Sequence, residues 1–122
     1  MNKRIVIKVG TSSLVYESGK LNLKKFENLA WVLSDLKNRG YDIVLVSSGA
    51  IAVGAERLGL AERPRDITHK QAASAVGQAA LIKIYDNFFM AYNQFLSAYS
   101  ISIVPIWKLS HYRYECMDLP RF

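Results

Sequence analysis

The chain has 122 residues, of which 51% are hydrophobic and 21% are charged, which is the composition of a globular domain with a modest core and not that of a disordered or fibrous protein. The formal net charge of +6 favours anionic ligands, but the basic residues are scattered, so nucleic-acid binding is not favoured. The single cysteine, Cys116, cannot form an internal disulfide, and we therefore expect a cytoplasmic protein with an inert free thiol.

The first predicted element is a short strand at residues 4–9, in which Lys8 stands among apolar residues. Lys3 and Arg4 precede only this strand-length apolar run, which is shorter than the apolar region of a signal peptide. An unpaired charge in a buried strand is costly, so Lys8 is expected to contact a ligand, to pair with another group or to extend into solvent. Gly10 and the hydroxyl residues after it end the strand.

A loop or hairpin is predicted for residues 14–21, and Asn22 is expected to cap the helix that follows. Gly40 ends this helix as the residue after its C-cap. The apolar side chains that repeat at helical spacing within it are Leu23, Phe26, Leu29, Ala30, Leu33 and Leu36. Residues 43–46 form the next strand, and the strand–helix–strand order with short links implies a right-handed parallel crossover.

The second strand runs directly into Ser47, Ser48 and Gly49, and an alanine-rich helical pattern follows at residues 50–58. Such a junction brings backbone N–H groups and small polar side chains to the carboxyl edge of a parallel sheet, where ligands bind. The first strand ends in a similar junction. The two junctions predict a site for anionic ligands, although ordinary turn chemistry explains the second one about equally well.

A surface connection at residues 59–68 leads to a long helix predicted from His69 to about Tyr92. Gly77 within it predicts a close approach of another backbone. The positions assigned to its apolar side are Ala72, Ala73, Val76, Ala80, Leu81, Ile84, Tyr85, Phe88 and Phe89. One more strand is expected around residues 101–106, and Pro105 indicates that this strand lies at an edge or ends there. The elements together predict an α/β fold with a mainly parallel sheet and helices on both faces.

Several kinds of site and segment are not predicted. His69 and His111 lack partners at metal-ligand spacing, so we expect no metal site on the protein. No His/Cys/Asp set indicates covalent catalysis. The longest uncharged stretch, residues 95–107, is too short and too polar to cross a bilayer, so no membrane partner is expected.

Three motifs stand out in chain order: KVGTSSL at residues 8–14, VSSGAIAVG at 46–54 and KQAASAVGQ at 70–78. Their combination resembles the glutamate 5-kinase family of the amino acid kinase superfamily. Related kinases of that superfamily share the opening strand with its lysine and glycine, but they do not share this combination of three motifs. The resemblance covers about residues 3–94 and implies an amino acid kinase-like fold, which is incomplete here.

The resemblance implies transfer of the γ-phosphate of ATP, with Mg²⁺, to the side-chain carboxylate of L-glutamate. The product, glutamyl 5-phosphate, feeds proline biosynthesis, and proline commonly inhibits the family. The family also suggests a homo-oligomer. Carried over by position, Lys8 would contact the ATP phosphates and stabilise the transferring group, and Gly10 and Thr11 would line the same phosphate turn.

On the substrate side, the resemblance implies that Ser48, with Gly49 and Ala50 beside it, holds glutamate. The third motif would pack near this site and receives no catalytic role. The alternatives to a glutamate 5-kinase are a noncatalytic fragment that binds glutamate or proline, and an amino acid kinase for another carboxylate.

After Gln94 the sequence departs from the family pattern. We therefore expect residues 1–94 to be the N-terminal part of an amino acid kinase domain and residues 95–122 to be a divergent segment, from a truncated or frameshifted gene product. Ser110 and His111 resemble a family segment only faintly. In the family the adenine pocket and further phosphate-facing residues come later in the chain, so this chain is expected to lack a complete ATP site.

Overall fold

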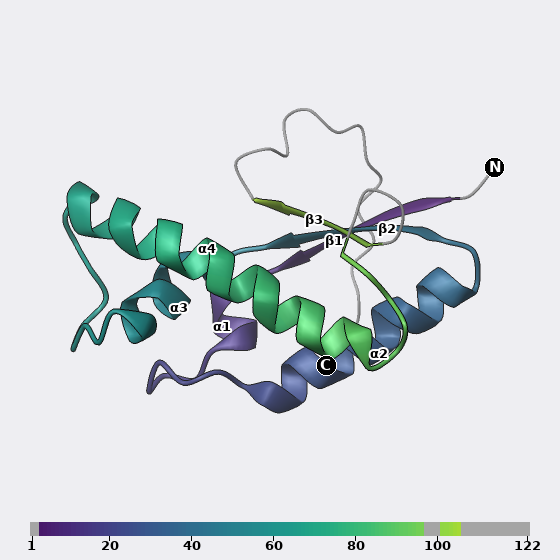
Figure 1. The fold of residues 1–122 in the computed structure, drawn as a ribbon, viewed down its shortest axis with the longest axis horizontal. Coiled ribbons are helices and arrows are strands. Elements are labelled where there is room, and N and C mark those ends of the chain that lie inside the picture. Colours follow the sequence, from purple (N-terminus) through teal and green to yellow (C-terminus); the bar gives the residue numbers. More distant parts are fainter. Residues whose placement is uncertain (1–2, 97–100, 106–122) are drawn as a thin grey trace.

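The structure is a computed structural model that describes residues 3–96 and 101–105. It contains three strands, β1 (Arg4–Val9), β2 (Asp42–Ser47) and β3 (Ile101–Pro105). The helices are α1 (Thr11–Leu14), α2 (Leu23–Asn38), α3 (Ala50–Arg57) and α4 (Ile67–Met90). The strands form one parallel sheet in the order β1-β2-β3, and Figure 1 shows this sheet along the upper side of the helices. The predicted α/β class and parallel crossover are confirmed, and Pro105 ends a strand at the edge of the described sheet.

Some sequence predictions fall on residues outside the described ranges. These are the predictions for Ser110, His111, Cys116 and most of the divergent segment at 95–122. The domain boundary after Gln94 stays a prediction. Among the helices that the structure describes, none is both long and apolar enough to cross a membrane.

Local interactions of residues near the ends of the elements stabilise the β1–α2–β2 unit. The Asn22 side chain accepts a hydrogen bond from the Lys25 amide at 3.3 Å, and this confirms the predicted cap of α2. Gly40, directly after the C-cap of α2, has a φ of +94°, which a glycine adopts without strain. At the start of the strand pair, Arg4 lies opposite Asp42 in register, and their side chains form an ion pair of 2.6 Å.

The main hydrophobic core lies between one face of the sheet and the helices. Alternate residues of β1 and β2, including Ile5, Ile7 and Leu45, point into it. Each helix contributes to it with the side chains of Leu14, Phe26, Leu29, Ala30, Leu33, Val53, Leu81, Tyr85 and Phe89. On the other face Val6, Val44 and Val46 form a separate buried cluster. The described helices therefore contact one face of the sheet, whereas the sequence predicted helices on both faces.

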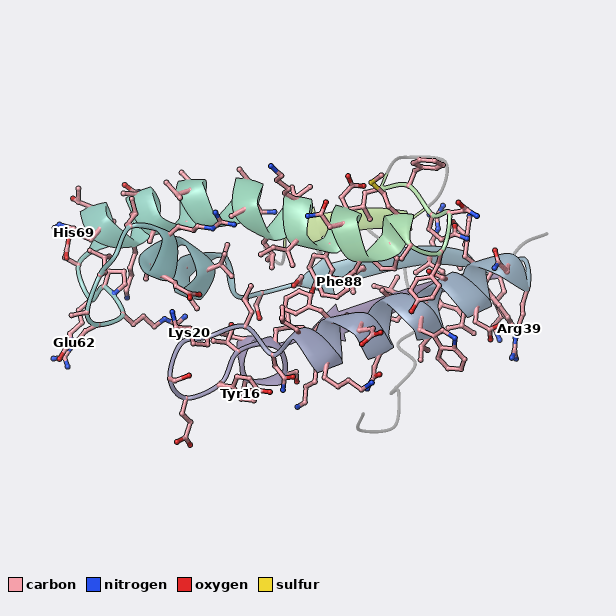
Figure 2. The ribbon with its side chains drawn as sticks, turned by 60° about the horizontal axis from the view of Figure 1, so that its bottom comes forward. Tyr16, Lys20, Arg39, Glu62, His69 and Phe88 are labelled. Atoms are coloured by element: carbon pink, nitrogen blue, oxygen red, sulfur yellow. The ribbon has the colours of Figure 1, made fainter. Side chains whose placement is uncertain are left out.

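The side chains of α2 and α4 meet through aromatic rings. The ring of Phe26 on α2 stands 5.2 Å from the ring of Tyr85 and 5.7 Å from that of Phe88, centroid to centroid. Figure 2 shows Phe88 between α4 and α2. Aromatic pairs at such distances contribute stability beyond that of burying their apolar surface. These rings therefore stabilise the contact between α2 and α4.

Three positions assigned to apolar helix sides lie at the surface instead. Leu23, the first residue of α2, is 59% exposed. The first side chain of α2 that is buried in the core is Phe26, one turn later. Ala72 and Val76 on α4 are exposed because α4 packs on its neighbours along its other side, through residues such as Ala73 and Gly77. Periodicity located these helices correctly but overestimated the width of their buried sides.

Two boundaries also differ from the prediction. Helix α4 begins at Ile67, earlier than expected, because the Asp66 carboxylate caps it by accepting a hydrogen bond from the His69 amide at 3.0 Å. Residues 11–13 were expected only to end the first strand and residue 14 to begin a loop or hairpin, but residues 11–14 form the single helical turn α1. Its closing bond joins the Val15 amide to the Thr11 carbonyl.

Helices α3 and α4 pack backbone against backbone. A Cβ at Gly77 would overlap the carbonyl oxygen of Ala50, and a Cβ at Gly54 would overlap that of Ala73. Overlap with backbone atoms cannot be relieved by a side-chain rotation. The close approach predicted at Gly77 is confirmed, and its consequence is that α4 holds the first turn of α3 in place.

We expect Gly77→Ala to lower the free energy of unfolding by about 1–3 kcal/mol or more, because the added methyl group must push α3 away from α4. Urea unfolding followed by circular dichroism measures this change. Gly10→Ala is the matched control, since a Cβ there meets nothing within 4 Å and the backbone is extended. A stability loss at Gly77 no larger than at Gly10 would contradict the steric argument.

The cap of α4 predicts a dependence of stability on acid pH. The hydrogen bond from the His69 amide is the largest cause that lowers the pKa of Asp66 below its ordinary value of 3.8. The stabilising contribution is therefore complete above pH 3.8 and is lost as the pH falls through the lowered pKa. We expect Asp66→Ala to destabilise the protein at pH 7 and the difference from wild type to shrink toward pH 2. A difference that stays constant over this range would count against the charged cap.

Candidate functional site

The two junctions predicted from the sequence come together at the carboxyl edge of the sheet. Strands β1 and β2 are parallel neighbours, so the turns after them meet, and the Thr11 and Ser48 hydroxyl oxygens lie 3.2 Å apart. The amide and the hydroxyl of Ser48 both donate to the Val9 carbonyl, at 3.0 and 3.2 Å. Because the Ser48 hydroxyl has only one proton, the Thr11 hydroxyl must donate to it. The result is one polar cluster shared by the two turns.

A glycine lies on each side of this cluster. Gly10 leaves its backbone atoms accessible, and Gly49 adopts an unusual backbone conformation. Gly49 caps α3 with a φ of +103°, where side chains are rarely tolerated, and it lies against Thr11. Gly10 has an extended backbone with open space where a Cβ would stand, so a ligand can approach its main chain. Ala50 begins α3 and is half-buried.

Lys8 lies on the other face of the sheet from the helices. It alternates with Ile7 and Val9, whose side chains enter the main core, and it pairs in register with Val46. The Lys8 side chain is exposed, close to the carboxyl end of β1. This position keeps its ammonium group at the surface, and its contact with a phosphate stays a prediction.

Ser47 does not belong to the ligand set in which the sequence placed it. Its side chain is only 7% exposed and its hydroxyl oxygen lies 2.8 Å from the phenol oxygen of Tyr85 on α4. In β2 the residues Ile43, Leu45 and Ser47 all face the helices, so Ser47 points away from its neighbour Ser48. Sequence reasoning missed Tyr85 as a polar partner. The available signal was a hydroxyl-bearing ring among residues otherwise assigned to the core.

An open groove of about 1050 Å³ begins at Thr11 and Ser12 and continues between residues 15–20 and α3. Residues 15–21 form the predicted hairpin, closed by the antiparallel bridge between Val15 and Leu21. Figure 2 shows Tyr16 and Lys20 on this side of the molecule and Glu62 in the loop after α3. The groove gives a ligand access to the polar cluster from the Thr11 side.

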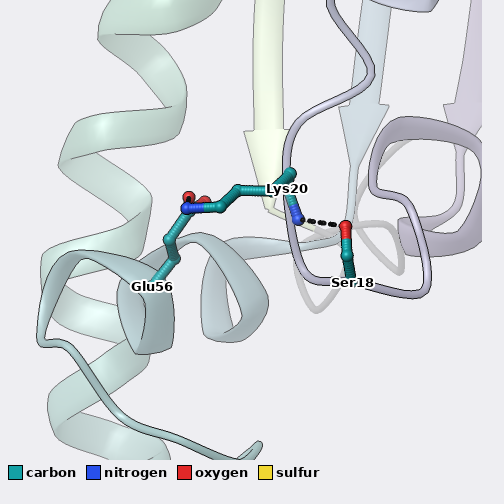
Figure 3. A network of polar contacts seen from close by, with 3 residues as sticks. All are labelled: Ser18, Lys20 and Glu56. Carbon is teal, nitrogen blue, oxygen red and sulfur yellow. Dashed lines mark hydrogen bonds and ion pairs between the residues drawn. The ribbon is translucent and has the colours of Figure 1, made fainter.

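An ion pair joins the hairpin to α3 across this groove. The Lys20 ammonium lies 3.0 Å from a Glu56 carboxylate oxygen, and the Lys20 amide makes a longer contact of 3.5 Å with the Ser18 hydroxyl (Figure 3). The Lys20 side chain is 73% exposed, so water screens the pair and its contribution to stability is small. Its effect is to set where the hairpin stands relative to α3.

A profile of the Amino acid kinase family matches residues 3–113 of this sequence. The chain belongs to the amino acid kinase family. The glutamate 5-kinase of Enterococcus faecalis is 58% identical over 92 residues, which are 75% of this chain and 34% of that protein. The glutamate 5-kinases of Lactococcus lactis and Listeria welshimeri are 50% and 55% identical over 95 and 93 residues, or 78% and 76% of this chain and 35% and 34% of theirs. The chain thus spans about a third of the length of these curated relatives.

The third motif packs against α3 through its backbone, at Ala73 and Gly77. Gly77 lies against Ala50 at the start of α3. Lys70, at the other end of the motif, is exposed and lines an adjoining hollow of about 510 Å³ together with Arg63 and Arg65. The motif therefore supports the turn after β2 by backbone packing.

Residues 3–96 and 101–105 hold no group of three His, Cys, Asp or Glu side chains close enough to bind a metal ion. Mg²⁺ in proteins is held by carboxylates together with substrate phosphates. We assign no step of a reaction to a metal.

The buried phenol predicts a loss of stability at alkaline pH. Burial raises the pKa of Tyr85 from 10.0 to about 12, and its hydrogen bond with Ser47 opposes this only in part. The unfolded chain then releases the proton first, so stability is complete below pH 10 and falls as the pH rises toward 12. We expect a decline on the order of 2 kcal/mol in wild type that is absent in Tyr85→Phe.

The measurement is the free energy of unfolding in urea between pH 8 and pH 12. Tyr92→Phe is the control because it keeps Tyr85, so it should show the wild-type decline. An equal decline in Tyr85→Phe would assign the effect to other groups.

Proposed function

We propose that this chain forms the glutamate-side part of a glutamate 5-kinase, which transfers the γ-phosphate of ATP to the side-chain carboxylate of L-glutamate. The observation that carries the proposal is the shared polar cluster of Thr11 and Ser48, with hydroxyl oxygens 3.2 Å apart. This cluster lies at the carboxyl edge of the sheet, where ligands bind in α/β folds. Its setting is a chain 50–58% identical to proteins named glutamate 5-kinase.

In this reaction a carboxylate oxygen of glutamate forms a bond to the γ-phosphorus. The bond from that phosphorus to the β,γ-bridging oxygen breaks, and ADP leaves with the electron pair. Both reactants are anions, so catalysis depends on positioning them and on neutralising their charge. Lys8 is proposed to contact the ATP phosphates, with Gly10 and Thr11 lining the phosphate turn, because Lys8 is exposed at the end of β1 and the Gly10 backbone is open to a ligand.

The second turn is proposed to hold glutamate. Ser48 offers its hydroxyl oxygen as an acceptor, and Gly49 and Ala50 offer main-chain N–H groups at the start of α3, where the helix dipole favours a negative charge. The product would be glutamyl 5-phosphate, an acyl phosphate for proline biosynthesis, and L-proline is proposed as an inhibitor. The family resemblance implies Mg²⁺ with the ATP.

The test is ATP- and Mg²⁺-dependent phosphorylation of L-glutamate by the purified chain, with the acyl phosphate trapped by hydroxylamine and folding followed by circular dichroism. Glutamyl hydroxamate above the ATP-free control supports the proposal. L-Aspartate and N-acetyl-L-glutamate serve as competing acceptors, and preferential use of either would identify a kinase for another carboxylate. Binding of glutamate without turnover would favour the noncatalytic alternative. A folded chain that neither turns over nor binds glutamate would contradict the proposal.

In a restored full-length version of the enzyme, we expect Lys8→Ala to lower the rate of glutamyl hydroxamate formation by about 100-fold or more, because one positive contact with the transferring phosphoryl group is lost. The decrease should appear in kcat, with little change in the free energy of unfolding, because Lys8 is exposed. Lys83→Ala on α4 is the matched control, since this exposed lysine lines neither the groove nor the polar cluster. Equal rates for the two variants would reject the role of Lys8.

A further inference from the structure

Tyr85 and Ser47 form a buried hydroxyl pair. Neither the packing of the core nor the proposed reaction explains this pair. Tyr85 is 1% exposed, Ser47 is 7% exposed, and their oxygens are 2.8 Å apart. Packing alone does not require the phenol oxygen, because the ring contacts with Phe26 and Phe89 would be the same for a phenylalanine. The hydroxyl therefore calls for a separate explanation.

The direction of the hydrogen bonds follows from counting protons. The Ser47 hydroxyl donates its only proton to the Ser48 carbonyl oxygen at 3.0 Å. The bond between the two hydroxyls must then be donated by Tyr85. Burial raises the pKa of Tyr85 to about 12, so this proton is present at neutral pH. A directed relay runs from the phenol of Tyr85 through Ser47 to the Ser48 carbonyl.

The Ser48 carbonyl belongs to the same peptide unit as the Gly49 amide. This unit is planar and trans, so the Gly49 N–H points in the opposite direction to the carbonyl oxygen. The oxygen is held on the side of Ser47, and the N–H is thereby directed away from it. Gly49 is buried, and within residues 3–96 its amide donates to no acceptor, so a ligand that reaches this amide would pair a buried donor.

Gly49 is the residue of this turn that lacks a Cβ, and its carbonyl accepts a hydrogen bond from the Val53 amide at 3.0 Å. Its φ of +103° lies in a region where glycine moves at little cost. The neighbouring Ser48 amide is already fixed by the Val9 carbonyl at 3.0 Å. The relay holds the carbonyl of Ser48. The peptide unit that carries the Gly49 amide is therefore held at its oxygen by Ser47.

We propose that Tyr85 and Ser47 are positioning residues that fix the Ser48–Gly49 peptide unit and so aim the Gly49 amide at the carboxylate of the bound substrate. The identity of the ligand, L-glutamate, rests on the function proposed above. Neither side chain contacts the ligand itself. Binding energy is gained because the amide donor is oriented before the ligand arrives.

The test uses the 122-residue chain and two readouts from nuclear magnetic resonance. The first is the hydrogen-exchange rate of the Ser48 amide without ligand, compared with that of the Ile7 amide in β1. The second is the dissociation constant of L-glutamate, followed by the shift of the Gly49 amide signal. The variants are Tyr85→Phe, Ser47→Ala and their combination, with Tyr92→Phe as the matched control that removes a tyrosine hydroxyl elsewhere.

In Tyr85→Phe we expect exchange at Ser48 to accelerate about tenfold while exchange at Ile7 stays within twofold of wild type. Glutamate binding should weaken about fivefold, the effect of one lost hydrogen bond. Because the two residues act through one relay, the double variant should bind no more weakly than the weaker single variant. Tyr92→Phe should match wild type in both readouts.

Acceleration spread equally over Ser48 and Ile7 would overturn the proposal, because it would show only a loss of global stability. Unchanged exchange at Ser48 would also overturn it, as would additive effects on binding in the double variant. If wild type itself does not bind L-glutamate, the proposed function fails, and the exchange rates alone then decide whether the relay fixes the turn.

Discussion

The close contact between α3 and α4 is the constraint on which the rest of the molecule depends. Gly54 and Gly77 let the two backbones touch, and this contact holds Ala50 at the start of α3. Two helical turns further along α4, about 12 Å away at 1.5 Å per residue, Tyr85 reaches Ser47 at the end of β2. A single helix therefore supports both sides of the turn that joins β2 to α3.

The described part of the fold was largely predictable because its signals are local. Asn22 and Gly40 mark the ends of α2 by chemistry that acts within one turn, and Gly77 marks a close approach because only glycine permits it. The exposure of Leu23 and Val76 was not predictable in the same way. Helical spacing shows which residues share a side, but the width of the buried part depends on neighbours that are distant in the sequence.

The candidate site was predictable at the level of its two turns but not in its internal contacts. Strand β2 is apolar on both faces, so its sequence does not reveal which residues face the helices and which do not. For this reason Ser47 and Ser48 looked equivalent, although one bonds to Tyr85 and the other to Val9. The partners of both serines come from other elements, and no short-range pattern encodes them. The roles of Lys8, Gly10 and Thr11 remain predictions that rest on family resemblance and position.

The place of β3 in the sheet has a consequence for how the chain is made. β3 pairs with β2, although α3 and α4 lie between them in the sequence, whereas β1, α2 and β2 come from one contiguous stretch. During synthesis from the N-terminus, the β1–β2 pair can form while β3 is still untranslated. Pairing of β3 with β2 is slow because the segment between them is long, and until β3 pairs, one edge of β2 has no hydrogen-bonded neighbour. An open edge accepts strands from other molecules, so the interval between translation of β2 and of β3 is when the nascent chain most needs protection from misassembly.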